Sequence, residues 1–393
     1  MKLVSWAPAL FILFALLTDC SHTEQQKILT RKFLEPIKES RQDAYFYMAR
    51  SNMPGSSIAV SVEGKLVWSE GFGYASRDLK VPASRVTRYR IGEVTQVLTA
   101  LTYQLLAEQG KLHPDSTVQH YYPDFPLKKY RLTVRNLAEQ TSGIRPPTDE
   151  EKIRKSLNVG LEAGLDCFKN DSLLFMPGSF QFPSIYNYNL LGMVIQKATG
   201  KRFSDVVKEL VTDTLGMKET VPDNLLGVIE NRADFFDHDY MSRIIHAVST
   251  DNRYKMPSEG YLSTAEDLNR LGTSLLFSEY IPGSVKNKIF EQVKLPGGPP
   301  TRWANGWFHA ENESGNSYYF ITGNITGGGA ALVVFPSEKL VIAWASNIEN
   351  EIDEFPVYKI AMNFINFING NKVDQPNNTL KTRKDALKDS GQK

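Results

Sequence analysis

The chain carries few of the short motifs that place catalytic side chains close together in sequence. A Ser-x-x-Lys motif, in which the lysine lies about one helical turn from a nucleophilic serine and can take its proton, occurs only at Ser390–Lys393. This copy lies in a charged stretch at the C-terminus, where nothing would preorganise a site. The Gly-x-Ser-x-Gly and His-Glu-x-x-His motifs do not occur at all.

Metal-ligating residues are equally sparse. The six histidines show no ligand spacing, and Asp237–Asp239, which contains His238, is the one cluster worth considering. A solvated loop is the simpler interpretation of that cluster. Cys20 and Cys167 cannot form a disulfide framework or a zinc site by themselves, and we interpret Cys167 as a buried, inert thiol. We therefore expect no metal and no cofactor.

The composition indicates an ordinary globular protein. Of 393 residues, 41% are hydrophobic and 23% are charged, so long disorder, collagen and coiled coil are excluded for most of the chain. This length can bury a large core. The formal net charge of +1 offers no electrostatic footprint for nucleic acid, which we exclude as a partner.

The N-terminus resembles a targeting segment. One lysine precedes an apolar run from Leu3 to Leu17, and small residues follow it up to Cys20. This pattern is typical of a secretory signal peptide, and the run is shorter than the roughly 20 residues of a membrane span. We predict a signal peptide over residues 1–20 and a secreted, extracellular protein without a membrane span. An uncleaved signal anchor in the secretory pathway is the alternative.

Four Asn-x-Ser/Thr sequons agree with this route. We predict glycans at Asn170, Asn312 and Asn377, which lie in polar stretches. Asn324 lies in an expected strand, with its side chain on a face that helices should cover, so we predict no glycan there. Residues 371–393 are polar and charged and are interpreted as a solvated tail, which leaves one domain over residues 28–370.

The periodicity of apolar residues predicts strands near both ends of this domain and helices between them. Helices are expected at Ile28–Ala49, from Val94 to Gly110, and at Pro356–Asn369. Hairpins are expected at Ser57–Trp68 and Ala331–Trp344. We therefore predict an α/β (α+β) fold, in which the two hairpins pair in one antiparallel sheet flanked by the terminal helices, with an all-helical insertion.

A collinear set of short motifs resembles the serine β-lactamase and penicillin-binding-protein family, class C branch. The matches span about residues 28–369 and include Gly55–Val60, Glu70–Ala75, Tyr89–Gly92, Gly110–Leu112, Thr141–Ile144, Pro177–Ser179, Tyr188–Gly192, Leu215–Met217, Gly260–Leu268, Gly306–Trp307 and Thr326–Gly328. Two further stretches, Val118–Pro126 and Phe168–Asp171, look most like an animal mitochondrial branch associated with filament assembly.

The resemblance implies three catalytic elements: a Ser-x-x-Lys at a helix start, a Tyr-x-Asn, and a Lys/His-Thr-Gly on an edge strand. In this chain the serine position holds Glu93 and the lysine position holds Gln96. The tyrosine position holds Pro183, followed by Ser184. Tyr186 lies nearby, but the fixed distance to the next helix argues against it.

The third element reads Ile325-Thr326-Gly327, in which Ile325 can neither carry charge nor donate a hydrogen bond. A primary amide such as Gln96 is no base near neutral pH. Loss of the nucleophile or the base alone costs roughly 10⁶ in kcat in a unit of this kind. Only an oxyanion hole, which consists of backbone N–H groups, could survive.

We therefore interpret the chain as a catalytically inactive, secreted glycoprotein that acts by binding or assembly, with no catalytic residues. An active hydrolase of the esterase or peptidase class with non-standard residues is one alternative. A self-assembling structural protein is the other. The sequence does not identify the ligand or protein partner and leaves a homo-oligomer open.

Overall fold

The computed structural model describes residues 27–152, 160–350 and 355–373. Its largest sheet contains nine strands in the order β1-β3-β2-β14-β13-β12-β11-β10, with β4 paired to β3, and all of these pairs are antiparallel. The strands are β1 (Ile28–Leu29), β2 (Gly55–Val62), β3 (Lys65–Ser76), β4 (Val81–Pro82), β10 (Trp303–Ala304), β11 (Trp307–Glu311), β12 (Ser317–Ile325), β13 (Gly328–Phe335) and β14 (Leu340–Ser346).

The two ends of the domain meet in the middle of this sheet. Strand β14 pairs with β2, so that Ala343 lies opposite Ala59. The predicted pairing of the N- and C-terminal hairpins is therefore confirmed. Both strands are buried along their whole length, which agrees with their content of β-branched and small residues.

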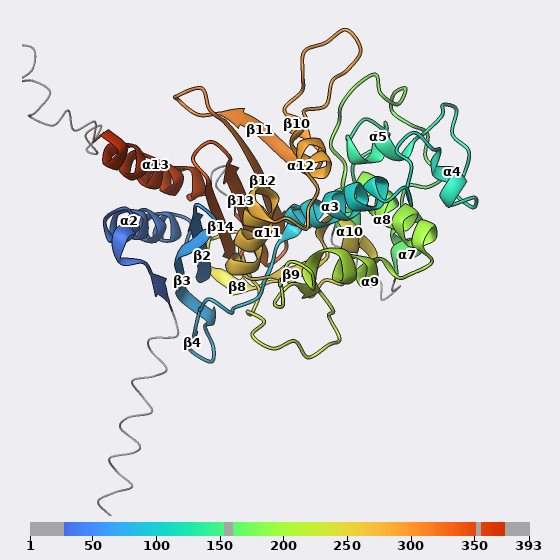
Figure 1. The fold of residues 1–393 in the computed structure, drawn as a ribbon. Coiled ribbons are helices and arrows are strands. Elements are labelled where there is room, and N and C mark those ends of the chain that lie inside the picture. The colour runs from blue at the N-terminus through green and yellow to red at the C-terminus, as the bar shows by residue number, and fades with distance from the viewer. Residues whose placement is uncertain (1–26, 153–159, 351–354, 374–393) are drawn as a thin grey trace, which may run out of the picture.

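Helices cover both faces of the sheet (Figure 1). On one face α2 (Leu34–Arg50) and α13 (Val357–Val373) lie side by side and bury a cluster that includes Phe33, Trp68, Trp344 and Phe364. On the other face α11 (Ala265–Phe277) packs on β2 and β14. Gly272 of α11 makes this packing close, because a Cβ there would lie 2.7 Å from Val341.

The predicted N-terminal helix was wrong at its start. Ile28 and Leu29 form strand β1 on the edge of the sheet, and the α-helix begins only at Leu34. Two apolar residues flanked by polar ones fit either structure, so periodicity could not separate them. The C-terminal helix extends to Val373, a few residues past the predicted end of the domain.

The helical insertion lies beside the sheet, opposite α2 and α13 in Figure 1. Its helices are α3 (Thr95–Glu108), α4 (Val118–Tyr121), α5 (Val134–Ala138), α6 (Asp149–Lys152), α7 (Leu161–Leu165), α8 (Ile185–Thr199), α9 (Phe203–Val207), α10 (Met256–Glu259) and α12 (Gly283–Phe290). Two small sheets join it to the rest: β5 (Tyr89–Arg90), β9 (Tyr261–Ser263) and β6 (Val221–Pro222), and β7 (Phe236–His238) with β8 (Ile244–His246).

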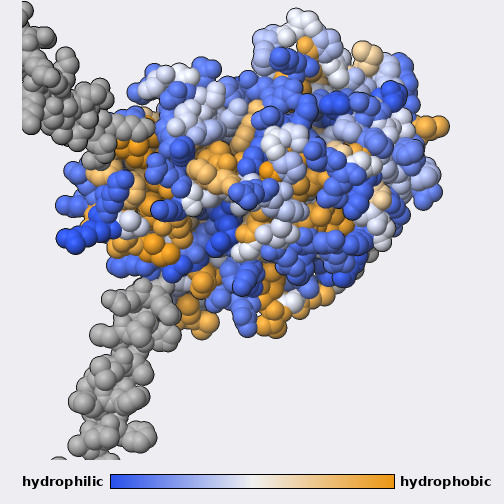
Figure 2. Space-filling view, viewed as in Figure 1, coloured by the Kyte–Doolittle hydropathy of each residue, from blue (hydrophilic) through white to orange (hydrophobic). Residues whose placement is uncertain are grey.

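Helix α3 forms the centre of this insertion, and nearly all of its residues are buried. The 3-10 helix Gly92–Val94, which leads into α3, lies against strand β12, and α3 itself packs against α12. Cys167 is half-buried rather than fully buried, a correction to the sequence-based expectation. In the part of the chain that is described, no helix is long and apolar enough to span a bilayer. Figure 2 shows apolar residues in several separate areas of the same face of the molecule.

Candidate functional site: a cleft between the sheet and the helical insertion

A cleft of about 640 Å³ lies where strand β12, the start of α3, the segment before α8, and α10 come together. Six of the seven positions predicted from the sequence line it: Glu93, Gln96, Pro183, Ser184, Ile325 and Thr326. Three stretches far apart in the sequence thus meet in one place. Gly327 is not part of the lining and lies in the turn between β12 and β13.

Strand β12 passes directly against the short 3-10 helix Gly92–Val94, which leads into α3. A Cβ on Gly323 would lie 2.2 Å from the carbonyl oxygen of Ile91 and 2.7 Å from the nitrogen of Glu93. A Cβ on Gly92, which has a φ of +50°, would lie 2.8 Å from the nitrogen of Asn324. Only glycine fits such a close approach of two backbones. The contact brings the N–H groups of Glu93 and Asn324 to the same corner of the cleft.

The carboxyl group of Glu93 occupies this corner. The backbone N–H of Asn324 donates to its Oε2 at 2.8 Å, and the N–H of Glu93 itself is a second donor to the same group. Two converging N–H groups of this kind are what an oxyanion hole consists of. The sequence left open the survival of such a hole, and the structure shows these two donors bonded to a side chain of the protein.

Burial and a second carboxylate raise the pKa of Glu93. Although part of the side chain faces the cleft, burial is the larger cause, the charge of Glu259 is the next, and together they raise the pKa to about 8. The hydrogen bonds from Asn324 and from its own N–H oppose the shift. A carboxyl group with this pKa is mostly protonated at neutral pH and can donate to Glu259.

Glu259 and its neighbour Lys255 complete the cleft floor. Both belong to the segment around α10, both line the cleft, and their side chains are only 8% and 4% exposed. Lys255 Nζ lies 2.7 Å from Glu259 Oε2. The floor therefore contains a chain of groups that runs from an ammonium through a carboxylate to a mostly protonated carboxyl and a backbone N–H. The sequence analysis missed Lys255 and Glu259, since their i, i+4 spacing is common to any surface helix.

A network of amides links the other two predicted positions. Gln140 Nε2 donates to Gln96 Oε1 at 3.4 Å, and Gln140 Oε1 accepts a hydrogen bond from the Ser184 N–H at 2.9 Å. Gln140 is buried and has a φ of +58°, a strained conformation for a residue with a side chain. An amide network binds and positions neighbouring groups but transfers no protons near neutral pH.

Ser184 is the one serine among the predicted positions, and its hydroxyl has a structural role. Its Oγ donates to the carbonyl of Arg145 at 2.7 Å and accepts a hydrogen bond from the Tyr186 N–H as the N-cap of α8. Tyr186 itself is buried and stacks on Phe168 with a centroid distance of 4.3 Å. The Ser184 hydroxyl is therefore committed to backbone groups.

The third element has a second copy that the sequence analysis overlooked. Ile321-Thr322-Gly323 repeats the three residue types of Ile325–Gly327, and its Gly323 is the residue that meets the start of α3. Ile321 and Thr322 line the cleft as well. Neither copy provides a lysine or histidine. This repeat is the signal in the sequence which shows that the third element can be aligned with either copy.

The walls of the cleft are largely apolar. Trp303 and Phe308 come from strands β10 and β11 at the edge of the sheet, and Pro146 and Pro147 come from the helical insertion. Asp149 and Lys152 pair with each other near the mouth, 2.8 Å apart. In the described ranges, no group of three or more His, Cys, Asp or Glu is placed to hold a metal ion. His238 of the Asp237–Asp239 cluster lies in strand β7, away from the residues that line the cleft.

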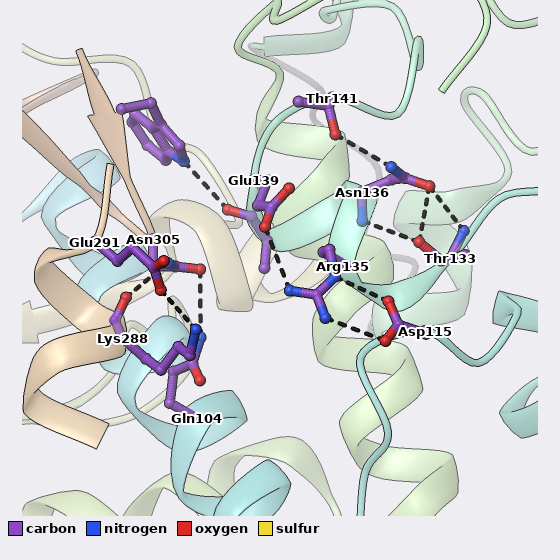
Figure 3. A network of polar contacts seen from close by, with 12 residues as sticks. Gln104, Asp115, Thr133, Arg135, Asn136, Glu139, Thr141, Lys288, Glu291 and Asn305 are labelled. Carbon is purple, nitrogen blue, oxygen red and sulfur yellow. Dashed lines mark hydrogen bonds and ion pairs between the residues drawn. The ribbon is translucent and has the colours of Figure 1, made fainter. Parts of the chain in front are cut away.

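A second polar network lies at the other end of α3 (Figure 3). Arg135 bonds Asp115 at 2.9 Å and approaches Glu139 to 3.7 Å. A cavity of about 430 Å³ lies beside it, lined in part by Gln104, Lys288 and Asn305. Trp303 connects the two regions, because it lines the cleft while its indole N–H donates to the carbonyl of Ala138, next to Glu139.

The sequons differ in accessibility. Asn170 is exposed, as expected. The expectation that Asn312 is accessible is wrong, since it is 7% exposed, its Oδ1 accepts from the N–H groups of Ser314 and Asn316, and its Nδ2 donates to Glu338. A short polar loop can fold its asparagine inward to satisfy its own backbone. Asn324 exchanges hydrogen bonds with the backbone of Asn350, and Asn377 lies outside the described residues.

The sheet, its covering helices and the position of the cleft define a fold of the serine β-lactamase and penicillin-binding-protein type. A family model described as Beta-lactamase matches residues 43–365. The chain therefore belongs to the beta-lactamase family, whose members include serine hydrolases.

Among curated proteins, the chain is similar to the human "Serine beta-lactamase-like protein LACTB, mitochondrial", with 31% identity over 337 residues. The match covers 68% of this chain and 61% of the human protein, so the chain matches only about three fifths of that relative's length. No property of the whole human protein carries over on this basis alone.

Two solved structures show the same fold. One is the octameric penicillin-binding protein homologue from Pyrococcus abyssi, with a TM-score of 0.73 and 22% identity, covering 85% of this chain and 77% of that chain. The other is a class C beta-lactamase, with a TM-score of 0.69 and 19% identity, covering 84% and 96%. At such identities the likeness concerns the fold.

Proposed function

We propose that this chain is a non-acylating member of the beta-lactamase family that binds a small ligand non-covalently in the cleft. The observation that carries the proposal is the combination of a cleft of about 640 Å³ with polar groups that are bonded to one another. Glu93 accepts from two backbone N–H groups, and Gln96 is bonded to Gln140. Acyl transfer needs a nucleophile and a base within hydrogen-bond reach, and this pair is missing at the three predicted positions.

The decisive experiment is covalent labelling of the purified chain with a fluorophosphonate probe and with a labelled penicillin. We expect no stoichiometric labelling by either reagent. The Glu93→Ser variant should also remain unlabelled, because the Gln96 amide cannot take the proton from the new hydroxyl. Specific labelling of the native chain that disappears on denaturation would contradict the proposal, and Ser184→Ala would then show whether Ser184 is the nucleophile.

A hydrolase with non-standard residues is the second candidate, and the groups on the cleft floor favour it. Glu93, Glu259 and Lys255 place two carboxyl groups and an amine in one enclosed site, with the pKa of Glu93 raised to about 8. Groups with such shifts occur at catalytic sites as well as in structural networks. Turnover of ester and amide substrates, with loss in both Glu93→Gln and Glu259→Gln, would support this candidate instead.

We further propose that the protein is secreted and glycosylated. The apolar segment at Leu3–Leu17 supports export, and the exposed Asn170 supports glycan attachment. The human relative is named as mitochondrial, whereas a secretory signal predicts export into the medium. N-terminal sequencing of material from the culture medium should find the first 20 or so residues removed, and retention with Met1 present would favour the anchor.

Self-assembly is a separate candidate that the octameric neighbour suggests. Size-exclusion chromatography with light scattering tests it directly. A mass that is a multiple of the chain's 44.3 kDa, after allowance for glycans and leader removal, would support assembly.

A further inference from the structure

A side chain of the protein, the Glu93 carboxyl, accepts a hydrogen bond from a backbone N–H group of strand β12 inside the cleft. We propose that Glu93 acts as an internal ligand of the paired N–H groups of Glu93 and Asn324, so that the cleft rejects ligands with an anionic group and accepts neutral or cationic ones. This inference deepens the proposed function and rests on it.

Two backbone N–H groups converge on the Glu93 carboxyl. The Asn324 N–H donates to the Glu93 carboxyl at 2.8 Å, and the N–H of Glu93 is the second donor. These N–H groups come from strand β12 and from the 3-10 helix that leads into α3, which are held together by the close contact of Gly92 and Gly323. Such a pair is a ready site for a carboxylate or another oxyanion. An incoming anion could use it only by displacing the Glu93 side chain.

Displacement would be costly because the rest of the floor offers no compensation. The ammonium of Lys255 is already paired with Glu259 at 2.7 Å, with both side chains nearly fully buried. A displaced Glu93 carboxyl would leave its hydrogen-bonded position beside Glu259. An anionic ligand would also bring a further negative charge next to the Glu259 carboxylate.

The remaining lining suits a ligand with an apolar body. Trp303 and Phe308 present aromatic surface, and Pro146, Pro147 and Pro183 present aliphatic rings. An aromatic face attracts a cation, whereas an anion gains nothing there. The Asp149 carboxylate near the mouth adds negative potential, which its partner Lys152 partly offsets. The walls therefore favour an apolar group of the ligand. The groups on the cleft floor determine which charge the ligand can have.

The test uses three probes of nearly the same shape and different charge: benzylamine, benzamide and benzoate. Binding is measured by ligand-observed NMR titration at pH 7 with the native chain and the variants. In the native chain we expect measurable binding of benzamide and benzylamine, and at least tenfold weaker binding of benzoate. In Glu93→Ala, where the two N–H groups are open, the affinity for benzoate should rise at least tenfold.

Two variants separate occupancy from charge. Glu93→Gln cannot ionise and leaves an amide oxygen in the same corner, so benzoate should still be excluded. Asp149→Asn removes a negative charge near the mouth without opening the N–H pair, so benzoate affinity should change less than about threefold. A tenfold gain in either variant would overturn the proposal, since simple repulsion would then explain the exclusion.

The outcomes for the two proposals are distinguishable. If the native chain binds benzoate as well as benzamide, or if folded Glu93→Ala gains no benzoate affinity, the role of Glu93 is wrong. If the native chain binds none of the probes but Glu93→Ala gains benzoate binding, the internal-ligand role holds and the proposed binding of small aromatic ligands fails. Circular dichroism and the melting temperature establish that each variant is folded.

Discussion

Two networks at opposite ends of helix α3 contain the same groups in different surroundings. Each has one cation and two carboxyl groups: Lys255, Glu259 and Glu93 at the cleft floor, and Arg135, Asp115 and Glu139 in the second network (Figure 3). In the cleft the carboxylate stands between the cation and the other carboxyl. In the second network the arginine stands between the two carboxylates.

The carboxyl groups of the two networks differ in solvent exposure, and this difference shifts the pKa of each group. The side chain of Asp115 is 77% exposed, and its hydrogen bond from Arg135 lowers its pKa. Glu139, bonded to the same arginine but more enclosed, has a pKa raised by burial. Glu93 lies further along the same trend, with burial and Glu259 raising its pKa to about 8. Burial thus raises the pKa of a carboxyl group that would be ionised in solvent.

Removal of the buried cation should have the largest effect on stability. Lys255→Met leaves the Glu259 carboxylate in the cleft floor without its partner, and we expect a loss of about 3–5 kcal/mol in the free energy of unfolding at pH 8. Urea denaturation of this variant and of Arg135→Met at pH 8 checks the comparison. Equal losses in the two variants would show that burial does not separate the networks.

The titration of Glu93 should produce a smaller, pH-dependent effect. Its pKa is about 8 in the folded chain, against an ordinary value of 4.5, so the folded state binds more protons than the unfolded state between these values. The contribution of this group to stability is therefore fully present below about pH 4.5 and is lost as the pH rises through 8.

Glu93→Gln removes this titration. We expect its melting temperature to match that of the native chain near pH 5 and to exceed it by a few degrees near pH 8.5. Differential scanning calorimetry over this range makes the measurement. A constant offset between the two proteins at every pH would mean that Glu93 does not take up the proton.

Loss of the exposed carboxylate should have the smallest effect. Asp115→Asn removes a partner of Arg135 at a largely solvated position, and we expect a loss of less than about 1 kcal/mol at pH 7. Because the pKa of Asp115 is lowered, this contribution is present above the unfolded-state pKa and disappears as the pH falls through the folded-state value. It should also decrease in high salt. A loss comparable to that of Lys255→Met would contradict the contrast between the two networks.

Much of the fold could be predicted because the sheet and its helices have simple periodic sequences. The hairpins at Ser57–Trp68 and Ala331–Trp344 alternate or run as continuous β-rich segments, and both were found in the structure. Strand β1 was missed, because two residues carry no period. The position of the cleft followed from the family resemblance, since Glu93, Gln96, Pro183 and Ile325 do meet there.

The details of the site could not be predicted in the same way. Gln140 looks like an ordinary polar residue in a loop, yet it connects Gln96 with Ser184. Asn312 lies in a polar stretch, yet its side chain is buried by the turn that it stabilises. Side-chain hydrogen bonds depend on which segments meet in space, and a linear pattern contains little of that information.

The sequence by itself determined what these side chains cannot do, since no fold can make a base of Gln96 or a hydrogen-bond donor of the Ile325 side chain. The tertiary structure decided which groups surround them. It brings Gly323 against Gly92, so that two backbone N–H groups converge on the Glu93 carboxyl. It also places Glu259 and Lys255 beside that carboxyl, in surroundings dry enough to keep a proton on it near neutral pH. Hydrogen-bond directions and burial arise only when distant segments pack together, and these two quantities set the charge of the site.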